Sequence, residues 1–225
     1  MKIFGHRGAA GLVAENTLES IEEALSHKVD GIEIDVHRCK SGELVVIHDE
    51  TLQRTTNGFG KVSEFTLQQL NTYRTKEGFQ IPTLDQVLNL VDTKCDLNIE
   101  LKGIGTAIPV IELLESKIKN SEWNYDHFIL SSFDHSQLFQ VKLATNKFKL
   151  GVLTEKNIAS VLKVAESLGA YAIHPPVRSL EKKEVIAAKD KGYEVNVWTV
   201  NDPVDIKSSK KLKIDTIITD FPNLV

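Results

Sequence analysis

Short apolar runs rich in β-branched residues alternate along this chain with stretches whose apolar residues recur at helical spacing. The alternation is typical of parallel strands, because each parallel connection needs a crossover, usually a helix. We expect strands at 3–5, 31–36, 97–101, 128–131, 149–153, 171–173, 195–199 and 216–218. Helices are expected at 17–26, 84–91, 107–119, 136–145, 158–168, 180–191 and 204–210.

Eight strands with helices between them fit either an open, doubly wound sheet or a closed barrel. An open sheet that binds a dinucleotide carries a glycine-rich fingerprint after its first strand, and none follows residues 3–5. We therefore expect an α/β fold of the closed kind, a TIM (β/α)8 barrel. Because 225 residues is an ordinary length for one barrel, residues 1–225 are expected to form a single domain.

Two segments depart from the regular repeat. Residues 44–47 follow the second strand after only a few turn residues, too few for a helix, which predicts an antiparallel hairpin return. Residues 50–80 are much longer than an ordinary connection and contain several glycines, so they are expected to form a small insertion or lid. Departures from a regular array are where function is expected.

Composition excludes several partners. The formal net charge is −4 and no long basic run occurs, so nucleic acid is not expected as a ligand. No apolar run approaches the roughly 20 residues that span a bilayer, and residues 1–6 leave no room for a secretory segment. Cys39 and Cys95 lack metal-binding or disulfide spacing, which favours a cytoplasmic protein. The oligomeric state is left open.

Acidic residues alternate with apolar ones in two of the expected strands. Strand periodicity places Glu33 and Asp35 on one face, and Glu100 and Lys102 on one face of the next barrel strand. Glu33 and Asp35 alone are equally compatible with a solvated edge strand. A third carboxylate at a strand's carboxyl end, where barrel enzymes hold their active sites, favours a cage for Mg²⁺ or Ca²⁺, with Lys102 directed at a bound anion.

Histidines occur close to these acids. His6 follows the first strand, and Arg7 beside it offers a planar fork suited to phosphate oxygens. If the hairpin turn centres on Lys40 and Ser41, His48 lies opposite Glu33. Two histidines beside a phosphate-binding cation supply a general acid and a general base at neutral pH, as cleavage of a phosphodiester requires.

Four further residues have more than one interpretation. Asn16 fits a helix cap and also a contact to substrate. Trp198 fits the barrel core and also a pocket wall against the substrate. His37 should point away from the acids by strand alternation, so we leave it out of the site, and His174 at a strand end stays undecided.

These segments together resemble the glycerophosphodiester phosphodiesterase family, and the resemblance covers essentially the whole chain. The motifs are His6-Arg7-Gly8, Glu15-Asn16-Thr17, Glu33-x-Asp35, His48-Asp49, Leu52-x-Arg54-Thr55-Thr56, Ile81-Pro82-Thr83-Leu84, Ile99-Glu100-Leu101-Lys102, Ser131-Ser132-Phe133, Val197-Trp198-Thr199-Val200-Asn201 and Ile218-Thr219-Asp220-Phe221-Pro222. One departure is Ala14, where the family has proline, and we expect it to loosen the start of the helix without affecting the chemistry.

The resemblance implies a barrel with a characteristic insertion at 50–80, and a divalent cation, Mg²⁺ or Ca²⁺, held by Glu33, Asp35 and Glu100. It also implies His6 and His48 as the acid and base pair, and Arg7 and Lys102 on the phosphate. We expect the substrate to be a small glycerophosphodiester, hydrolysed to glycerol phosphate and an alcohol.

Three alternatives remain at this point. The nucleophile can be water, or the substrate's own glycerol hydroxyl acting through a cyclic phosphate. A phospholipase of the D type would need an apolar mouth near the insertion, where Phe59, Phe65 and Phe79 lie. An inactive barrel that only binds glycerophosphodiesters would not need two histidines and three acids.

Overall fold

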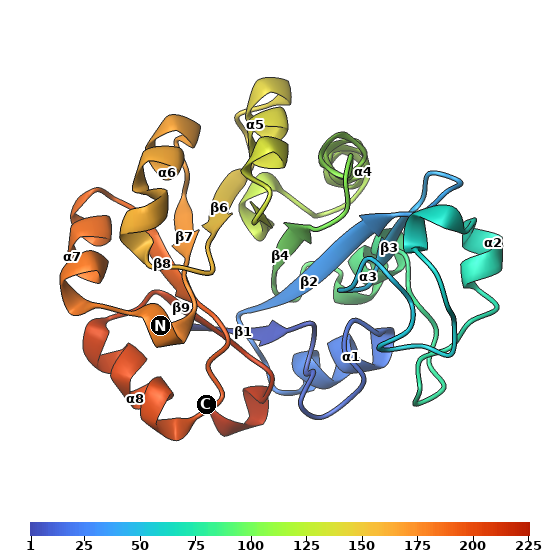
Figure 1. Ribbon diagram of the computed structural model, residues 1–225, viewed down its shortest axis with the longest axis horizontal. Helices are drawn as coiled ribbons and strands as arrows, with labels where there is room; N and C mark the ends of the chain where they lie inside the picture. Colours follow the sequence, from blue (N-terminus) through green and yellow to red (C-terminus); the bar gives the residue numbers. More distant parts are fainter.

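The chain forms a closed barrel whose eight strands are all parallel, as the alternating pattern predicts. The computed structural model describes residues 1–225, and the helices surround the strands (Figure 1). The sheet closes because β1 pairs with both β2 and β9. The barrel strands are β1 Lys2–His6, β2 Gly31–Arg38, β4 Asp96–Leu101, β5 Phe128–Ser132, β6 Lys149–Leu153, β7 Ala172–His174, β8 Glu194–Val197 and β9 Thr216–Thr219.

Each expected helix is present, with shifts of a few residues at the ends. The α-helices are α1 Leu18–Ser26, α2 Leu67–Leu70, α3 Leu84–Val91, α4 Ala107–Asn120, α5 His135–Ala144, α6 Leu162–Leu168, α7 Lys182–Asp190 and α8 Pro203–Leu212. Short 3₁₀ helices lie at η1 Val62–Glu64, η2 Tyr125–His127, η3 Ile158–Val161, η4 Val177–Ser179 and η5 Pro222–Leu224. The expected helix at 158–168 therefore divides into η3 and α6. No helix is both long and apolar enough to cross a membrane.

Local capping chemistry explains several helix starts. Thr83 accepts a hydrogen bond from the Gln86 backbone while the Gln86 side chain returns to the Thr83 backbone, which is a capping box. Asp134 caps α5, and Asp202 caps α8 with Pro203 in its first turn. At α1, however, the cap is Thr17, so the interpretation of Asn16 as the cap is wrong.

The hairpin return is confirmed as strand β3, Leu44–Val46, antiparallel to the outer half of β2. In the observed register Val36 pairs with Val46. This pairing is shifted by one residue from the one that a turn centred on Lys40 and Ser41 would give. His48 therefore does not lie opposite Glu33. β3 has already ended, and the backbone N–H of Ile47 donates to the carbonyl of Asp35 at 3.0 Å.

The insertion at 50–80 has a small apolar core of its own, which it shares with β3. Leu52, Val62 and Leu70 from the insertion are buried there against Val45, and Phe65 meets Tyr73 edge to face. Figure 1 shows the insertion, with α2, at the side of the barrel beyond β2 and β3. The segment is thus packed onto the hairpin that carries the chain to His48.

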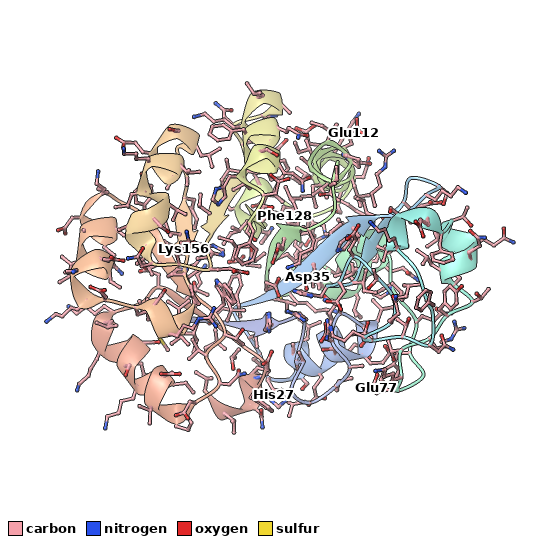
Figure 2. The ribbon with its side chains drawn as sticks, viewed as in Figure 1. His27, Asp35, Glu77, Glu112, Phe128 and Lys156 are labelled. Atoms are coloured by element: carbon pink, nitrogen blue, oxygen red, sulfur yellow. The ribbon has the colours of Figure 1, made fainter.

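Side chains of the barrel strands divide between two environments. Alternate residues such as Ile32, Ile34 and Leu97 face outward into the main apolar core under the helices. The residues between them face the barrel interior, where Phe4, Ile129 and Ile218 form a separate small cluster. Asp35, on β2, lies near the middle of the molecule in the view of Figure 2.

Candidate active site

Three buried carboxylates converge at the carboxyl ends of β2 and β4. Glu33, Asp35 and Glu100 are 4%, 1% and 6% exposed, and one oxygen from each lies within 4.8 Å of the others. The parallel register explains the arrangement, because Asp35 pairs with Glu100 on the neighbouring strand. The predicted grouping of these three acids is therefore what the fold produces.

The electrostatics of the three acids fit a cation. Burial, and then the charges of its two acidic neighbours, hold the pKa of Glu33 well above its usual range. Burial and the charge of Asp35 raise the pKa of Glu100 to about 7. Burial also acts to raise the pKa of Asp35, but the Arg7 charge and other cationic neighbours lower it overall. Oxygen ligands that repel one another this strongly suit a hard divalent cation.

His6, the last residue of β1, is held by a carboxylate from the other end of the chain. Its Nδ1 lies 2.6 Å from Oδ1 of Asp220, just beyond β9. Its Nε2 lies 3.9 Å from Oε2 of Glu33. Asn201 donates to the second Asp220 oxygen at 2.6 Å and fixes the carboxylate. Asp220 stands in one of the sequence motifs but was given no role there, although it follows β9, which pairs with β1 and so lies beside His6.

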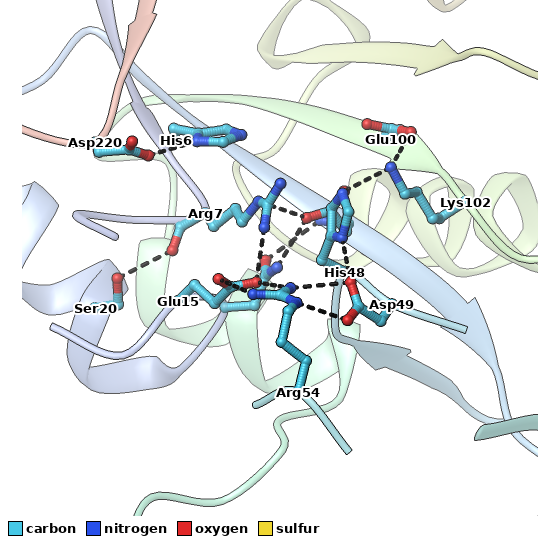
Figure 3. A network of polar contacts seen from close by, with 12 residues as sticks. His6, Arg7, Glu15, Ser20, His48, Asp49, Arg54, Glu100, Lys102 and Asp220 are labelled. Atoms are coloured by element: carbon cyan, nitrogen blue, oxygen red, sulfur yellow. Dashed lines mark hydrogen bonds and ion pairs between the residues drawn. The ribbon is translucent and has the colours of Figure 1, made fainter. Parts of the chain in front are cut away.

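His48 is held in the same way on the opposite side of the acids. Its Nδ1 lies 2.6 Å from Oδ1 of Asp49. Arg54, from the insertion, donates to both Asp49 oxygens at 2.6 and 3.0 Å and also to Glu15 at 2.7 and 2.8 Å. Burial is the main cause that lowers the pKa of His48. Figure 3 shows this network of polar contacts.

Two cationic side chains adjoin the acids. Arg7 Nη1 donates to Glu15 at 2.8 Å, and its Nε lies 3.4 Å from Asp35 without a well-formed hydrogen bond. Lys102, just past β4, donates to Glu100 at 3.0 Å and lies 3.7 Å from Asp35. Figure 3 shows Arg7 and Lys102 among the polar groups of the site, as the sequence predicts.

Asn16 is buried and is hydrogen-bonded to one of the three acids. It is 3% exposed, its Nδ2 donates to Asp35 at 2.8 Å, and its Oδ1 accepts from the Asp35 backbone at 3.3 Å. Both polar ends of the amide are thus occupied by one residue. In this arrangement Asn16 holds the side chain of Asp35, and the expected contact between Asn16 and substrate stays a prediction.

An aromatic wall borders the acids. Trp198 lies just beyond β8, which ends at Val197, one point where the expected strand 195–199 is too long. Its ring meets Phe133 edge to face at 5.5 Å, and its Nε1 donates to the His174 carbonyl at 2.8 Å. Both aromatic rings line the same pocket as His6 and Glu33, and Lys102 lies 5.5 Å from the centre of the Phe133 ring.

The two histidines that sequence left aside have different positions. His174 is fully buried in the barrel interior, where Nε2 contacts Asn196 at 3.1 Å, and burial lowers its pKa to about 3. His37 is buried as well, but its Nε2 lies 3.1 Å from the His48 carbonyl and it lines the cleft beside His48. The expectation that His37 points away from the acids is wrong, because residues 33, 35 and 37 alternate onto one face of β2, and His37 lines the cleft together with Glu100 and Lys102.

Comparison with known proteins agrees with this geometry. The model of the glycerophosphoryl diester phosphodiesterase family matches residues 6–224. A glycerophosphodiester phosphodiesterase from Caldanaerobacter subterraneus subsp. tengcongensis is 37% identical, covering 98% of this chain and 94% of the relative. One from Bacillus altitudinis is 36% identical, covering 99% and 95%.

Solved structures show the same barrel. A phosphodiesterase from Oleispira antarctica, in complex with the product sn-glycerol-3-phosphate, has a TM-score of 0.91 and 26% identity, covering 100% of this chain and 94% of that one. A glycerophosphodiester phosphodiesterase from Thermotoga maritima has a TM-score of 0.86 and 30% identity, covering 100% and 96%. This chain belongs to the glycerophosphoryl diester phosphodiesterase family and is an enzyme of that class.

Proposed function

We propose that the enzyme hydrolyses glycerophosphodiesters such as glycerophosphocholine and glycerophosphoethanolamine to sn-glycerol 3-phosphate and an alcohol, with a divalent cation and two histidines. The observation that carries the proposal is a pair of histidines, His6 and His48, each held by a carboxylate at Nδ1, on either side of the three buried acids. The product bound to the relative from Oleispira antarctica supports glycerol phosphate as the product here.

The acids and the cationic residues would divide the work of binding. Glu33, Asp35 and Glu100 would hold Mg²⁺ or Ca²⁺, which supplies positive charge to stabilise the charge that gathers on the phosphate oxygens. Arg7 offers further donors in a planar fork, and Lys102 a compact charge. Both lie in the site already, and both are positioned by acids rather than free in solvent.

The histidines would move the protons. Because Nδ1 of each ring is bound to a carboxylate, Nε2 is the nitrogen left for substrate. The carboxylate fixes the tautomer and stabilises the ring when it becomes protonated. One histidine would take a proton from the nucleophile, and the other would protonate the departing alcohol oxygen. Because both rings are held in the same way, either histidine can be the general base and the other the general acid.

Two routes share these residues. In one, water attacks phosphorus and glycerol phosphate is the first product. In the other, a glycerol hydroxyl of the substrate attacks and forms a cyclic phosphate, which water then opens. Single-turnover ³¹P NMR distinguishes them: a transient cyclic signal supports the second route, whereas ¹⁸O from labelled water in the first-formed product supports the first.

The aromatic wall supports a small, partly apolar substrate group. Trp198 and Phe133 would bound the glycerol side of the pocket. A lipid substrate would need an apolar mouth formed by the insertion, but Phe65 is packed inside the insertion, and neither Phe59 nor Phe79 lines the pockets around the acids. Water-soluble glycerophosphodiesters are therefore favoured over lysophospholipids.

The decisive experiment is release of sn-glycerol 3-phosphate from glycerophosphocholine and glycerophosphoethanolamine. We expect EDTA to abolish release, and Mg²⁺ or Ca²⁺ to restore it. His6→Ala and His48→Ala should each lower kcat by about 10²-fold or more, since general acid–base catalysis contributes 10²–10⁴-fold. His27→Ala is the matched control, because His27 pairs only with Glu23 at the surface. Near-normal rates for both active-site variants would exclude the two-histidine mechanism.

We also propose a cytoplasmic location. Cys39 and Cys95 are both free and buried, which suits a reducing compartment. Cell fractionation with an antibody to the protein tests the proposal, and recovery in the secreted fraction would refute it.

A further inference from the structure

One buried amide beside the three acids has no partner. Asn98 on β4 is 1% exposed, and its Oδ1 accepts no hydrogen bond. Buried polar atoms are nearly always hydrogen-bonded, so an unsatisfied one points to a site where a water molecule, an ion or a ligand binds. Asn98 lines the same pocket as Glu33 and Glu100.

The register of the barrel places this amide next to the acids. Asn98 pairs with Glu33 on the neighbouring strand β2, and Glu100 follows two residues later on the same face of β4. Glu33 and Glu100 thus lie beside Asn98 across the strand and along it. The amide belongs to the floor of the pocket that holds the acids.

The chemistry of an amide oxygen fits the same kind of ion. Hard divalent cations, above all Ca²⁺, take neutral carbonyl and amide oxygens together with carboxylates. An amide adds an oxygen without adding another negative charge to three acids that already repel one another. Rotation of the terminal amide also brings its oxygen or its nitrogen to the pocket at little cost.

We propose that the side-chain oxygen of Asn98 is a fourth protein ligand of the cation held by Glu33, Asp35 and Glu100. The inference rests on the proposed function only for the presence of a cation. Asn98 would then add an oxygen from β4, on the same strand face as Glu100. Its amide is the uncharged member of the ligand set.

Other unpartnered polar atoms in the interior provide the comparison. Asn196 on β8 is also 1% exposed with its Oδ1 unsatisfied, but its Nδ2 contacts His174 and it does not line the pocket with the acids. It matches Asn98 in residue type, burial and barrel setting. A defect caused only by loss of a buried amide should therefore appear equally in both positions.

The test is a calorimetric titration of the metal-free protein, after EDTA and dialysis, with the cation that restores activity, and without substrate. We expect Asn98→Leu to bind the ion at least tenfold more weakly than wild type, and Asn196→Leu to bind it as wild type does. Circular dichroism checks that each variant folds, and Asn98→Ala, which also lacks a side-chain oxygen, replaces Asn98→Leu if the larger apolar side chain is not tolerated.

A crystal structure of the cation-bound wild type provides a second readout. A distance of about 2.3–2.6 Å between Oδ1 of Asn98 and Ca²⁺, or about 2.1 Å for Mg²⁺, supports direct ligation. Unchanged affinity in the folded Asn98 variant, or an Asn98 oxygen that contacts only water, overturns the inference. If wild type binds no cation at all, the metal requirement of the proposed function fails instead, so the two failures are distinguishable.

Discussion

Asp220 and Asp49 lie behind the two histidines, at 2.6 Å from Nδ1 in each case. Hydrogen bonds from Arg54 are the main cause that holds the pKa of Asp49 well below its usual range. Burial acts to raise the pKa of Asp220, but the contact with His6 and the Asn201 bond lower it overall. Both carboxylates are therefore ionised at neutral pH, and each can stabilise a protonated ring.

Replacing either carboxylate by its amide tests this support. We expect Asp220→Asn and Asp49→Asn each to lower kcat by about 10²- to 10⁴-fold, because the amide no longer fixes the tautomer and cannot stabilise the charged histidine. The value of KM should change little. Asp126→Asn, at an exposed site, is the control. Steady-state kinetics that show unchanged kcat in both site variants would refute a role for these carboxylates in proton transfer.

His174 predicts a dependence of stability on pH. Its pKa is about 3 in the folded protein because of burial, against an ordinary value of 6.5. Below pH 6.5 the unfolded chain takes up a proton that the folded protein does not, so the free energy of unfolding falls as the pH drops from 6.5 toward 3. The slope from one such group approaches about 1.4 kcal/mol per pH unit.

Urea denaturation of wild type and His174→Gln across this pH range measures the effect. The variant should lose the part of the slope that comes from His174, because glutamine does not titrate. Equal slopes in the two proteins would show that His174 accepts a proton without unfolding.

Sequence predicted that the acids and both histidines lie together, but it gave no role to Asp49 and Asp220, which stand within the quoted motifs. Strand alternation and carboxyl ends are local features, which is why Glu33 and His6 could be found. The contact between His6 and Asp220 spans 214 positions and depends on barrel closure. The interpretation of Asn16 as a helix cap was wrong, because Thr17 caps α1 and the side-chain bonds of Asn16 go to Asp35 on β2.

Among the helices, α3 begins at Leu84, where the sequence predicts a helix start. Thr83 and Gln86 form reciprocal bonds that satisfy backbone donors at the first turn. The same helix buries Leu84 and Leu88 against the barrel. The capping box therefore fixes where the chain leaves the insertion and returns to the regular β/α repeat.

Thr83→Ala should lower the free energy of unfolding by about 1 kcal/mol, the usual contribution of such a cap. Thr83→Ser should retain most of the stability, since serine keeps the accepting oxygen. Chemical denaturation measures both variants. A loss of similar size in the serine variant would assign the effect to the threonine methyl group rather than to the cap.

The strands show where local patterns stop being informative. Each barrel strand was found from its apolar residues, because burial on the outer face is encoded in the segment itself. The pairing of β2 with β3 was wrong by one residue, since register depends on the geometry of the turn around Gly42. The end of β8 at Val197 is likewise set by neighbouring segments, including the contact of Trp198 with Pro176.

Side-chain contacts, as well as the continuous backbone, connect the barrel and the insertion. Arg54 of the insertion bonds Asp49 and Glu15, and the insertion core includes Val45 of the hairpin. These contacts lead us to propose that residues 1–225 unfold as one domain. The insertion would then be a part of the catalytic structure and not a mobile addition to it.

The variant Leu52→Ala tests whether the barrel and the insertion unfold together. Leu52 is fully buried in the insertion core, and its truncation should cost about 2–5 kcal/mol. We expect a single calorimetric transition at a lower temperature, with the barrel and insertion still unfolding together. Two separate transitions, with the barrel's unchanged, would show that the insertion is an independent unit.

The contact between His6 and Asp220 has a consequence for biosynthesis. β1 is made first and its partner β9 is the last barrel strand to be synthesised, so the sheet stays open while the ribosome translates everything between them. During that time the nascent chain holds its three acids and both histidines but lacks the carboxylate behind His6. Hydrolysis should therefore begin only after the last strand has left the exit tunnel and the barrel has closed.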